Sequence, residues 1–338
     1  MRYFYRYLLI TLSAYFLLGW LLPQWRPIHY PRALGPSFST DIRMDYQGLI
    51  DEQKPQALLL GNSVINSGID ESQFALLTSQ KTLKFGFPGT ASAYWYLLIK
   101  SNIATAITPP NYLLVFFLDN LLTTADLGVN GDYQPMIDEI AGENEVVLLQ
   151  KAYLNQLNPL EVYLDSQFPL FGERQTLKDK IDNRLKYTLP KLLQNCTKPC
   201  LDNALNAVFD EKNMLPQVLQ QNAINLDRWS INEWDFNALV KKSFIPDMIQ
   251  ITREKGINLI LVREKNIKLM TLEDESKDMR KYFQDMSDYL EKEGVPLLDF
   301  AHNPDLTLDM FRDGMHLNPQ GRMIFTRMVA EGFLTLLK

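Results

Sequence analysis

Five apolar runs of strand length recur along the chain, with amphipathic segments between them. The runs fall at Gln56–Leu60, Leu83–Phe87, Tyr112–Leu118, Asn258–Val262 and Pro296–Phe300. They are continuous rather than alternating, which is typical of parallel strands that are buried on both faces. The pattern therefore predicts an α/β fold with a five-stranded, parallel, doubly wound sheet.

Segments with a helical apolar period predict the helices that cover this sheet. These segments are Ser92–Ile103, Pro246–Glu254, Met279–Glu293 and Pro319–Leu337. The proline that opens the last segment suits a first helical turn, and apolar residues recur behind it at helical spacing. The alternation of strands and helices supports the doubly wound arrangement.

A long segment without a clear pair of strands separates the third predicted strand from the fourth. It covers residues 128–239 and contains predicted helices around Pro135–Leu157 and Gln175–Leu189. Because it is longer than an ordinary crossover, we expect a mostly helical insertion that caps the site or docks a partner. The α/β domain then consists of residues 56–127 and 240–338.

The N-terminal region differs from the rest of the chain. Arg2 and Arg6 precede Tyr7–Leu22, an uncharged run of sixteen residues. Aromatic residues stand near its ends, at Tyr3, Tyr5, Trp20 and Trp25, as in the interfacial belts of membrane helices. We expect residues 1–26 to form a cytoplasmic tip and a single-pass membrane anchor, and residues 27–55 to form a linker to an extracytoplasmic domain.

Two alternatives to the anchor stay open. The run is shorter than the about 20 residues that span a bilayer, so a cleaved signal peptide and a buried core helix are both compatible with it. No small-x-small cleavage site follows Leu22, because Pro, Gln, Trp and Arg come next. The absence of that site favours a retained anchor over a cleaved signal.

Composition narrows the class of protein. The 338 residues are 46% hydrophobic and 22% charged, which suits a chain with a large buried core rather than a disordered one. The formal net charge of −6 offers no basic surface for nucleic-acid phosphates. We therefore do not expect nucleic-acid binding.

The two cysteines, Cys196 and Cys200, stand in a C-x3-C spacing that contains a proline. In an oxidising compartment this spacing can close as a small local disulfide, and two unpaired structural cysteines are the alternative. A zinc site needs more ligands, and the three histidines, His29, His302 and His316, all lie far from the cysteines in sequence. With no Gly-rich phosphate loop either, we predict neither a metal nor a cofactor.

Ligands of open α/β sheets bind beyond the carboxyl ends of the strands, so the residues that follow each predicted strand are the candidate site. They are Asn62 and Ser63 after the first strand, Gly86, Pro88 and Gly89 at the second, Asp119 and Asn120 after the third, and Arg263 and Glu264 after the fourth; the fifth leads through His302 to Phe311–Asn318.

The last of these segments carries the most specific pattern. Asp313 and His316 are three residues apart just before a predicted helix. This spacing lets the carboxylate accept from one ring nitrogen and leaves the other nitrogen to face a nucleophile. A serine needs such a base, and the base needs an orienting partner. Ser63, His316 and Asp313 together supply the three roles.

These residues resemble the motifs of the SGNH (GDSL-type) hydrolases. The tripeptide Gly61–Ser63 (GNS) resembles their block I Gly-Asp-Ser, and Asp313–Gly321 (DGMHLNPQG) resembles their block V Asp-x-x-His. The resemblance covers about Gln56–Leu127 and Ser243–Lys338 and leaves out the insertion. It implies an SGNH-like, flavodoxin-like sheet in which Ser63 is the nucleophile.

By the same resemblance His316 is the general base and Asp313 orients it. The oxyanion donors are implied to be the backbone of Gly89, with Gly86 as second candidate, and the side chain of Asn120. Block III should read Gly-x-Asn-Asp, whereas this chain has FFLDN, and Asn62 replaces the usual block I aspartate. A missing oxyanion donor costs about 3 kcal/mol of transition-state stabilisation, so we expect slow hydrolysis, which suits a transferase.

An N-terminal membrane segment before such a domain is similar to the extracytoplasmic proteins of D-alanyl transfer (DltD-like) and alginate acetylation. The resemblance implies an acyltransferase that moves an acyl group, acetyl by expectation, to or from an envelope or secreted polysaccharide. It also implies a membrane-bound O-acyltransferase as partner. A secreted carbohydrate esterase, a non-catalytic assembly or docking subunit and a carbohydrate-binding module stay open as alternatives.

Each candidate also has a structural interpretation. Ser63 after Gly-Asn suits the cap of the following helix. Gly86 and Gly89 suit a turn, and Asn120 suits a structural loop. Arg263 suits either an anionic group of the substrate or a structural ion pair, of which we favour the ion pair.

Overall fold

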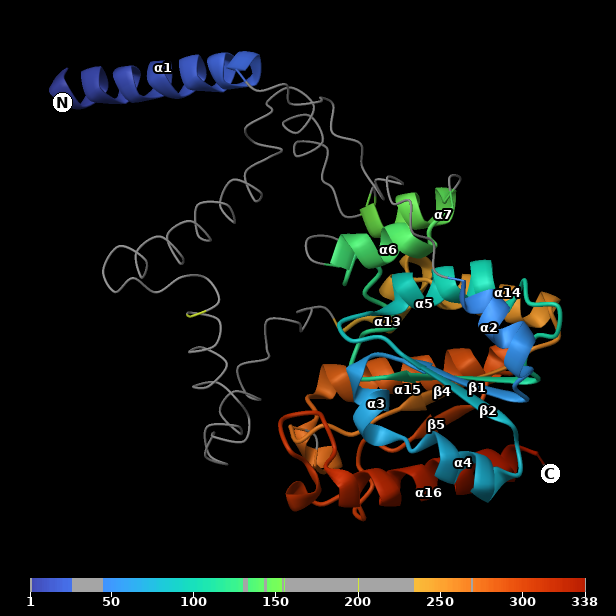
Figure 1. Ribbon diagram of the computed structural model, residues 1–338. Coiled ribbons are helices and arrows are strands. Elements are labelled where there is room, and N and C mark those ends of the chain that lie inside the picture. The colour runs from blue at the N-terminus through green and yellow to red at the C-terminus, as the bar shows by residue number, and fades with distance from the viewer. Residues whose placement is uncertain are drawn as a thin grey trace. The chain divides into compact units, whose positions relative to one another are not determined.

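The computed structural model describes residues 2–25, 45–129, 133–142, 145–153, 155, 200, 234–268 and 270–337 (Figure 1). The chain divides into two compact units. The helix α1 (Arg2–Trp25) belongs to the first unit, and all the strands belong to the second. Each unit is described by itself.

The second unit is built on the predicted parallel sheet. Its strands are β1 (Ala57–Gly61), β2 (Thr82–Gly86), β3 (Tyr112–Phe117), β4 (Asn258–Arg263) and β5 (Leu297–Asp299), in the order β2-β1-β3-β4-β5. All four neighbouring pairs are parallel, and Gly61 lies opposite Gly86 in the β1–β2 register. This order is that of a flavodoxin-like doubly wound sheet, so the prediction of an α/β fold with a five-stranded parallel sheet is confirmed.

Alternate strand residues point to opposite faces, and each face has its own apolar core. Leu58 and Leu60 of β1 pack into one core, while Leu59 packs into the other. The first core is covered by α2 (Tyr46–Gln53), α5 (Ser92–Leu98), α14 (Ile245–Glu254) and α15 (Lys277–Glu293). The second is covered by α3 (Ser63–Gly68), α4 (Glu71–Thr78) and α16 (Pro319–Leu336).

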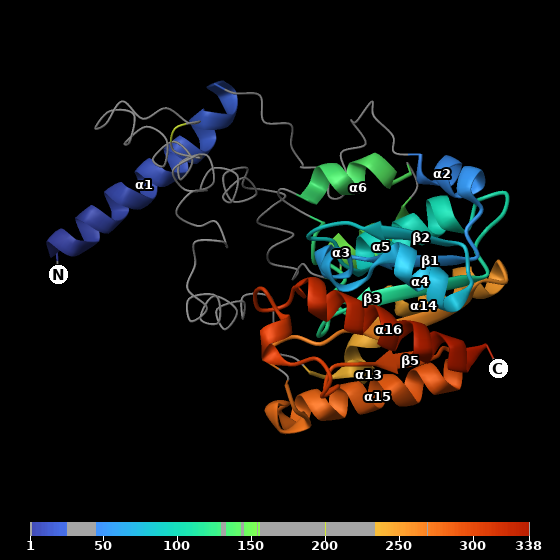
Figure 2. The ribbon, with the colours of Figure 1, turned by 60° about the horizontal axis from the view of Figure 1, so that its bottom comes forward.

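The figures show the same layers. In Figure 1, α4 and α16 lie below the strands, and α2, α5 and α14 lie above them. Figure 2 shows α16, drawn in red, running beside α4. The predicted helix Ser92–Ile103 is present as α5 followed by the π-helical turn η1 (Ile99–Ile103).

The predicted linker ends earlier than expected. Asp45 caps α2 by accepting a hydrogen bond from the backbone N–H of Gly48, and Ile50 is buried in the core of the sheet unit. Asn102 also accepts a bond from the N–H of Gln47 at 3.3 Å. Residues 45–53 therefore belong to the α/β domain, because the short apolar face of α2 packs into the core of the sheet unit.

The described helices of the expected insertion also pack into the α/β domain. The predicted helix Pro135–Leu157 is divided into α6 (Gln134–Ile140), α7 (Val146–Leu148) and the π-helical turn η3 (Leu149–Tyr153). These elements and α13 (Phe236–Leu239) bury their apolar side chains in the core of the sheet unit. The predicted helix Gln175–Leu189 lies outside the described residues.

The N-terminal run forms the expected helix, α1, but not the expected membrane span. Among the helices that the structure describes, none combines the length and the apolar character needed to cross a membrane. The uncharged part of α1, Tyr7–Trp25, is nineteen residues long and ends with the polar and helix-breaking residues Pro23 and Gln24 before Trp25, whereas a span needs about 20 apolar residues. The expectation of a spanning anchor at residues 1–26 is therefore not supported.

Of the two cysteines in the predicted disulfide, the structure describes Cys200. Cys200 takes part in a disulfide bond, as the oxidising-compartment interpretation requires. Cys196 lies outside the described residues. Within the described part of the chain, no group of three or more His, Cys, Asp or Glu side chains is placed to hold a metal ion.

Candidate active site

Ser63 stands at the point where β1 gives way to α3. Asn62 has an extended backbone, and its side-chain oxygen accepts a hydrogen bond from the N–H of Val64 at 2.9 Å. Asn62 therefore caps the helix, and the hydroxyl of Ser63 is left for another partner. The absence of a side chain at Gly61 allows close packing here, since a Cβ atom would lie 3.2 Å from both Ile65 and Phe116.

The partner of Ser63 is His316, which lies 253 positions further along the chain. Nε2 of His316 lies 2.9 Å from Oγ of Ser63, and Nδ1 lies 2.8 Å from Oδ2 of Asp313. In a neutral ring, Nδ1–H donates to Asp313 and leaves Nε2 to accept from the serine hydroxyl. The structure thus brings together the three predicted residues in the order that a nucleophile, its base and an orienting carboxylate require.

Asp313 is held as an anion by several donors. Its Oδ1 accepts from the backbone N–H groups of Met315, at 2.9 Å, and His316, at 2.8 Å. Burial raises the pKa of this carboxyl, but the hydrogen bonds from the His316 side chain and from the two N–H groups outweigh it and lower the pKa to about 2. The carboxylate therefore stays ionised at neutral pH and can stabilise an imidazolium.

A tight loop sets the position of His316. Phe311 and Leu317 form an antiparallel bridge, and the N–H of Arg312 donates to the His316 carbonyl at 2.9 Å. Asn318 then caps α16 by accepting from the N–H of Gly321 at 3.0 Å. The helix therefore begins directly behind the base and fixes the end of the loop.

Gly321 explains the end of the DGMHLNPQG motif. A Cβ atom at this position would lie 2.6 Å from the carbonyl oxygen of Met310. The first turn of α16 therefore approaches the segment before the histidine more closely than any residue with a side chain allows. Glycine at this position brings the helix against the loop.

The two glycine candidates at the end of β2 differ in role. The Gly86 carbonyl accepts from Nδ2 of Asn66 at 3.0 Å, and a Cβ atom on Gly86 would overlap the Asn66 side chain. Gly86 thus has a structural reason to lack a side chain. Gly89 lies in the following turn, with φ +74, and a Cβ atom there would lie 2.1 Å from the ring of Tyr133.

The turn that carries Gly89 is fixed close to the Ser63 segment. The N–H of Phe87 donates to the Gly61 carbonyl at 3.0 Å, beside Ser63 in the chain. The hydroxyl of Thr90 donates to the Phe87 carbonyl at 2.7 Å and accepts from the indole N–H of Trp95 at 3.1 Å. This arrangement places the backbone of Gly89 at the carboxyl edge of the sheet, where Ser63 also lies.

Asn120 follows β3 at the same edge of the sheet. Its carbonyl accepts from the N–H groups and hydroxyls of Thr123 and Thr124. Its amide nitrogen is buried and has no hydrogen-bond partner in the described part of the chain. Such a donor costs about 1–3 kcal/mol, and catalytic donors in free enzymes often become aligned only when substrate binds. Asn120 therefore stays a candidate for the oxyanion donor.

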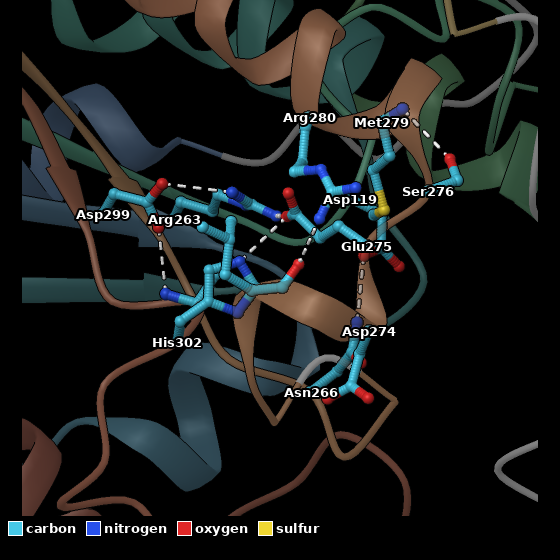
Figure 3. A network of polar contacts seen from close by, with 12 residues as sticks. Asp119, Arg263, Asn266, Asp274, Glu275, Ser276, Met279, Arg280, Asp299 and His302 are labelled. Atoms are coloured by element: carbon cyan, nitrogen blue, oxygen red, sulfur yellow. Dashed lines mark hydrogen bonds and ion pairs between the residues drawn. The ribbon is translucent and has the colours of Figure 1, made fainter.

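Arg263 lies in a structural ion-pair network (Figure 3). Its guanidinium is 2% exposed, pairs with Glu275 and Asp299, and stacks 3.2 Å from the ring centroid of Phe283. His302 contacts the same Glu275 at 3.1 Å. This geometry supports the structural interpretation of Arg263 and leaves little surface for a substrate anion.

Two residues near the site were missed by sequence reasoning. Tyr133, which packs on Gly89, comes from the expected insertion, where no strand end points to it. Asn266 bonds to Asp119 and lies three residues after β4. Extending the search by two more residues beyond each strand would have found Asn266, while no pattern in the sequence marks Tyr133.

The chain is similar to known proteins only at the level of solved structures. No protein-family model matches the chain, and no curated protein matches it. Solved structures similar to it include a GDSL-like lipase from Bacteroides thetaiotaomicron, an acetyl xylan esterase and a family 3 carbohydrate esterase from Talaromyces cellulolyticus.

These three structures are 9%, 11% and 11% identical to the chain, with TM-scores of 0.36, 0.36 and 0.34. The alignments cover 83% of this chain in each case and 88%, 99% and 96% of the other chains. Likeness at this level carries no inference about activity. The geometry of the site is therefore the basis for assigning a function.

The contact between Gly89 and Tyr133 yields a first prediction. Gly89→Ala should lower the free energy of unfolding by about 1–2 kcal/mol for the positive φ and by about 1–3 kcal/mol more for overpacking. Gly256→Ala is the matched control, because it shares a positive φ of +68 and has no atom within 4 Å of the added Cβ. Urea unfolding measures both, and equal losses in the two variants would contradict the packing account.

Gly321 yields a second prediction, which urea unfolding also tests. Gly321→Ala should destabilise the chain by about 1–3 kcal/mol, because the new methyl group meets a backbone oxygen. Gly332→Ala in the same helix meets side chains and no backbone atom, with Leu298 at 3.3 Å and the Phe300 ring at 3.4 Å, and serves as control. If Gly321→Ala is as stable as Gly332→Ala, close helix approach is not what requires glycine.

Proposed function

We propose that the chain is a serine acyl-transfer enzyme of the SGNH type, with Ser63 as nucleophile. The single observation that carries this proposal is the continuous hydrogen-bonded chain Ser63–His316–Asp313, with contacts of 2.9 and 2.8 Å. A structural serine needs no such base, and Asn62 already provides the helix cap. A side-chain triad in this order at the carboxyl edge of a parallel sheet matches the requirements of acyl transfer.

The reaction begins on an acyl ester. The oxygen of Ser63 attacks the carbonyl carbon while its proton passes to Nε2 of His316, and Asp313 stabilises the imidazolium. The bond between the carbonyl carbon and the alcohol oxygen then breaks, and the imidazolium returns the proton to that oxygen. An acyl-serine remains. A second hydroxyl reverses these steps and carries the acyl group away.

The oxyanion donors determine how fast this proceeds. The backbone N–H groups of Ser63 and Gly89 are the proposed donors, with the Asn120 amide as a third. Since that amide is buried in the free structure, its contribution depends on movement of the turn when substrate binds. Removal of one such donor typically costs about 10²–10³ in rate, so slow turnover is expected.

We further propose that the acceptor is a hydroxyl of an envelope or secreted polysaccharide and that the domain works outside the cytoplasm. The disulfide at Cys200 supports an oxidising compartment. The membrane-bound O-acyltransferase partner stays a prediction. Hydrolysis of the acyl-serine by water is the alternative, which makes the protein a carbohydrate esterase.

Covalent labelling tests the nucleophile. The full-length protein should react with a fluorophosphonate probe, and Ser63→Ala and His316→Ala should each abolish that reaction, because the probe needs a serine deprotonated by its base. Fluorescence of the labelled band and mass spectrometry of the labelled peptide provide the readout.

Ser67→Ala is the matched control for this experiment. Ser67 lies on the same short helix, but it is buried and its hydroxyl donates to the Val64 carbonyl at 3.0 Å. Labelling of this variant should match the wild type. A wild type that takes no label would sink the enzyme proposal and favour a docking or binding subunit.

The acceptor is tested separately with an aryl acetate as donor. Under the transfer proposal, acetate appears slowly in water, and an added polysaccharide becomes O-acetylated faster than free acetate is released. Mass spectrometry of the polymer and an acetate assay follow the two products. Fast acetate release that no polysaccharide changes would instead establish the esterase alternative.

The orienting carboxylate yields a further prediction. Asp313→Asn should lower kcat by a factor on the order of 10³–10⁴, because the amide no longer fixes the required tautomer or stabilises the imidazolium. The pKa of Asp313 is lowered to about 2, so its stabilising charge is present above its ordinary pKa and is lost only as the pH falls through about 2. A rate within tenfold of the wild type at neutral pH would contradict the triad.

A further inference from the structure

The loop that follows β4 contacts both sides of the proposed catalytic site. The N–H of Ile267 donates to the Gly314 carbonyl at 3.1 Å, inside the loop that carries Asp313 and His316. The preceding residue, Asn266, donates from Nδ2 to Oδ1 of Asp119 at 2.9 Å. One dipeptide therefore joins the base loop to the turn that carries Asn120.

Asn266 is built into this position. It is 6% exposed, and its side-chain oxygen accepts from the N–H of Lys268 at 2.9 Å, which leaves the amide nitrogen directed at Asp119. The loop itself is anchored further on, because Arg263 and Glu275 pair at its two ends. Figure 3 shows Asp119, Asn266 and this ion pair close together.

Asp119 needs such a partner. Its backbone has φ +46, a left-handed conformation that costs a residue with a side chain about 1–2 kcal/mol. Its carboxyl is buried, and burial raises its pKa, whereas Arg263, Lys268 and the bond from Asn266 act in the opposite direction. Glu275 and the phenol of Tyr282 are the other titratable groups that face it.

We propose that Asn266 is a positioning residue of the acyl-transfer site: its bond to Asp119 holds the Asn120 turn in register with the His316 loop. This inference rests on the proposed function. The side-chain hydrogen bonds of Asn266 run to Asp119 and Lys268 rather than to the triad, so it acts through Asp119 on one side and, by way of Ile267, through Gly314 on the other.

The Asn266–Asp119 pair makes the positioning role testable through a pH dependence of the labelling rate. We call the contact between Asn266 and Asp119 the clip. In Asn266→Asp two carboxyls face each other at the clip, and like charges at this distance raise one pKa, so that one proton is shared at lower pH. The proton then replaces the lost N–H donor. At higher pH the shared proton is lost and the two carboxylates repel. A residue with only a structural role in folding would not produce this pH dependence in the rate.

The experiment measures fluorophosphonate labelling rates of full-length variants at pH 6 and pH 8, each divided by the wild-type rate at that pH. Asn266→Asp should be slower by about tenfold to a hundredfold at pH 8, as expected for a misplaced catalytic loop, and nearer to the wild type at pH 6. The double variant Asp119→Asn with Asn266→Asp exchanges donor and acceptor and should recover at both values.

Asn258→Asp is the matched control. Asn258 is the first residue of β4, at the end of the strand opposite to the loop that carries Asn266, and its side chain donates to the Asn111 carbonyl at 3.0 Å. The substitution therefore makes the same chemical change far from the site. Its labelling rate should equal that of the wild type. Melting temperatures of all variants show whether each is folded at the temperature of the assay.

Three outcomes overturn the inference. Wild-type rates in Asn266→Asp at both pH values would show that the clip positions nothing. A loss that is equal at the two pH values, with no recovery in the double variant, would show a purely structural role. A wild type that takes no label overturns the proposed function and this inference with it, whereas labelled wild type with unaffected variants overturns the inference alone.

Discussion

The hydrogen bond between Ser63 and His316 joins positions 253 residues apart, and the parallel sheet is what makes it possible. In such a sheet the carboxyl ends of all strands lie at one edge, so segments that follow different strands meet there. Ser63 follows β1, the first strand of the chain and the second in the order β2-β1-β3-β4-β5, while His316 follows β5 at the far side. The long loop after β5 spans that width, and the Phe311–Leu317 bridge fixes its end.

Two carboxyl groups at this edge, those of Asp313 and Glu264, show how the environment sets the pKa. Asp313 accepts two backbone N–H bonds and one imidazole bond, and its pKa is lowered to about 2. Glu264, buried without a partner for one carboxyl oxygen, has its pKa raised to about 8 by burial. Hydrogen bonds to the ionised form therefore decide the difference. Only the first carboxylate carries the permanent charge that a catalytic imidazolium needs.

Much of the sheet followed from the sequence because its signals are local. Continuous apolar runs marked all five strands within a few residues. Burial on both faces is what the runs encode in β1, β3 and β4, whereas the edge strand β5 is only partly buried. No helix was predicted at α2, because its apolar face is only two turns long. The insertion was predicted too wide, because the short helices at its start show no apolar period that marks where the α/β domain ends. The meeting of Ser63 with His316 was expected from roles and motifs. The Asn266–Asp119 contact was not, since nothing local relates the ends of two neighbouring strands.

The turn that carries Gly89, the proposed oxyanion donor, packs against the start of the expected insertion. Gly128, with φ +71, lies so close to the Gly89 carbonyl that a Cβ atom on it would be 3.0 Å away. Tyr133 fills the space where a side chain of Gly89 would stand. Both residues come from the first turns of the expected insertion. Under the proposed function, the geometry of the oxyanion turn thus depends on a segment that the SGNH resemblance does not cover.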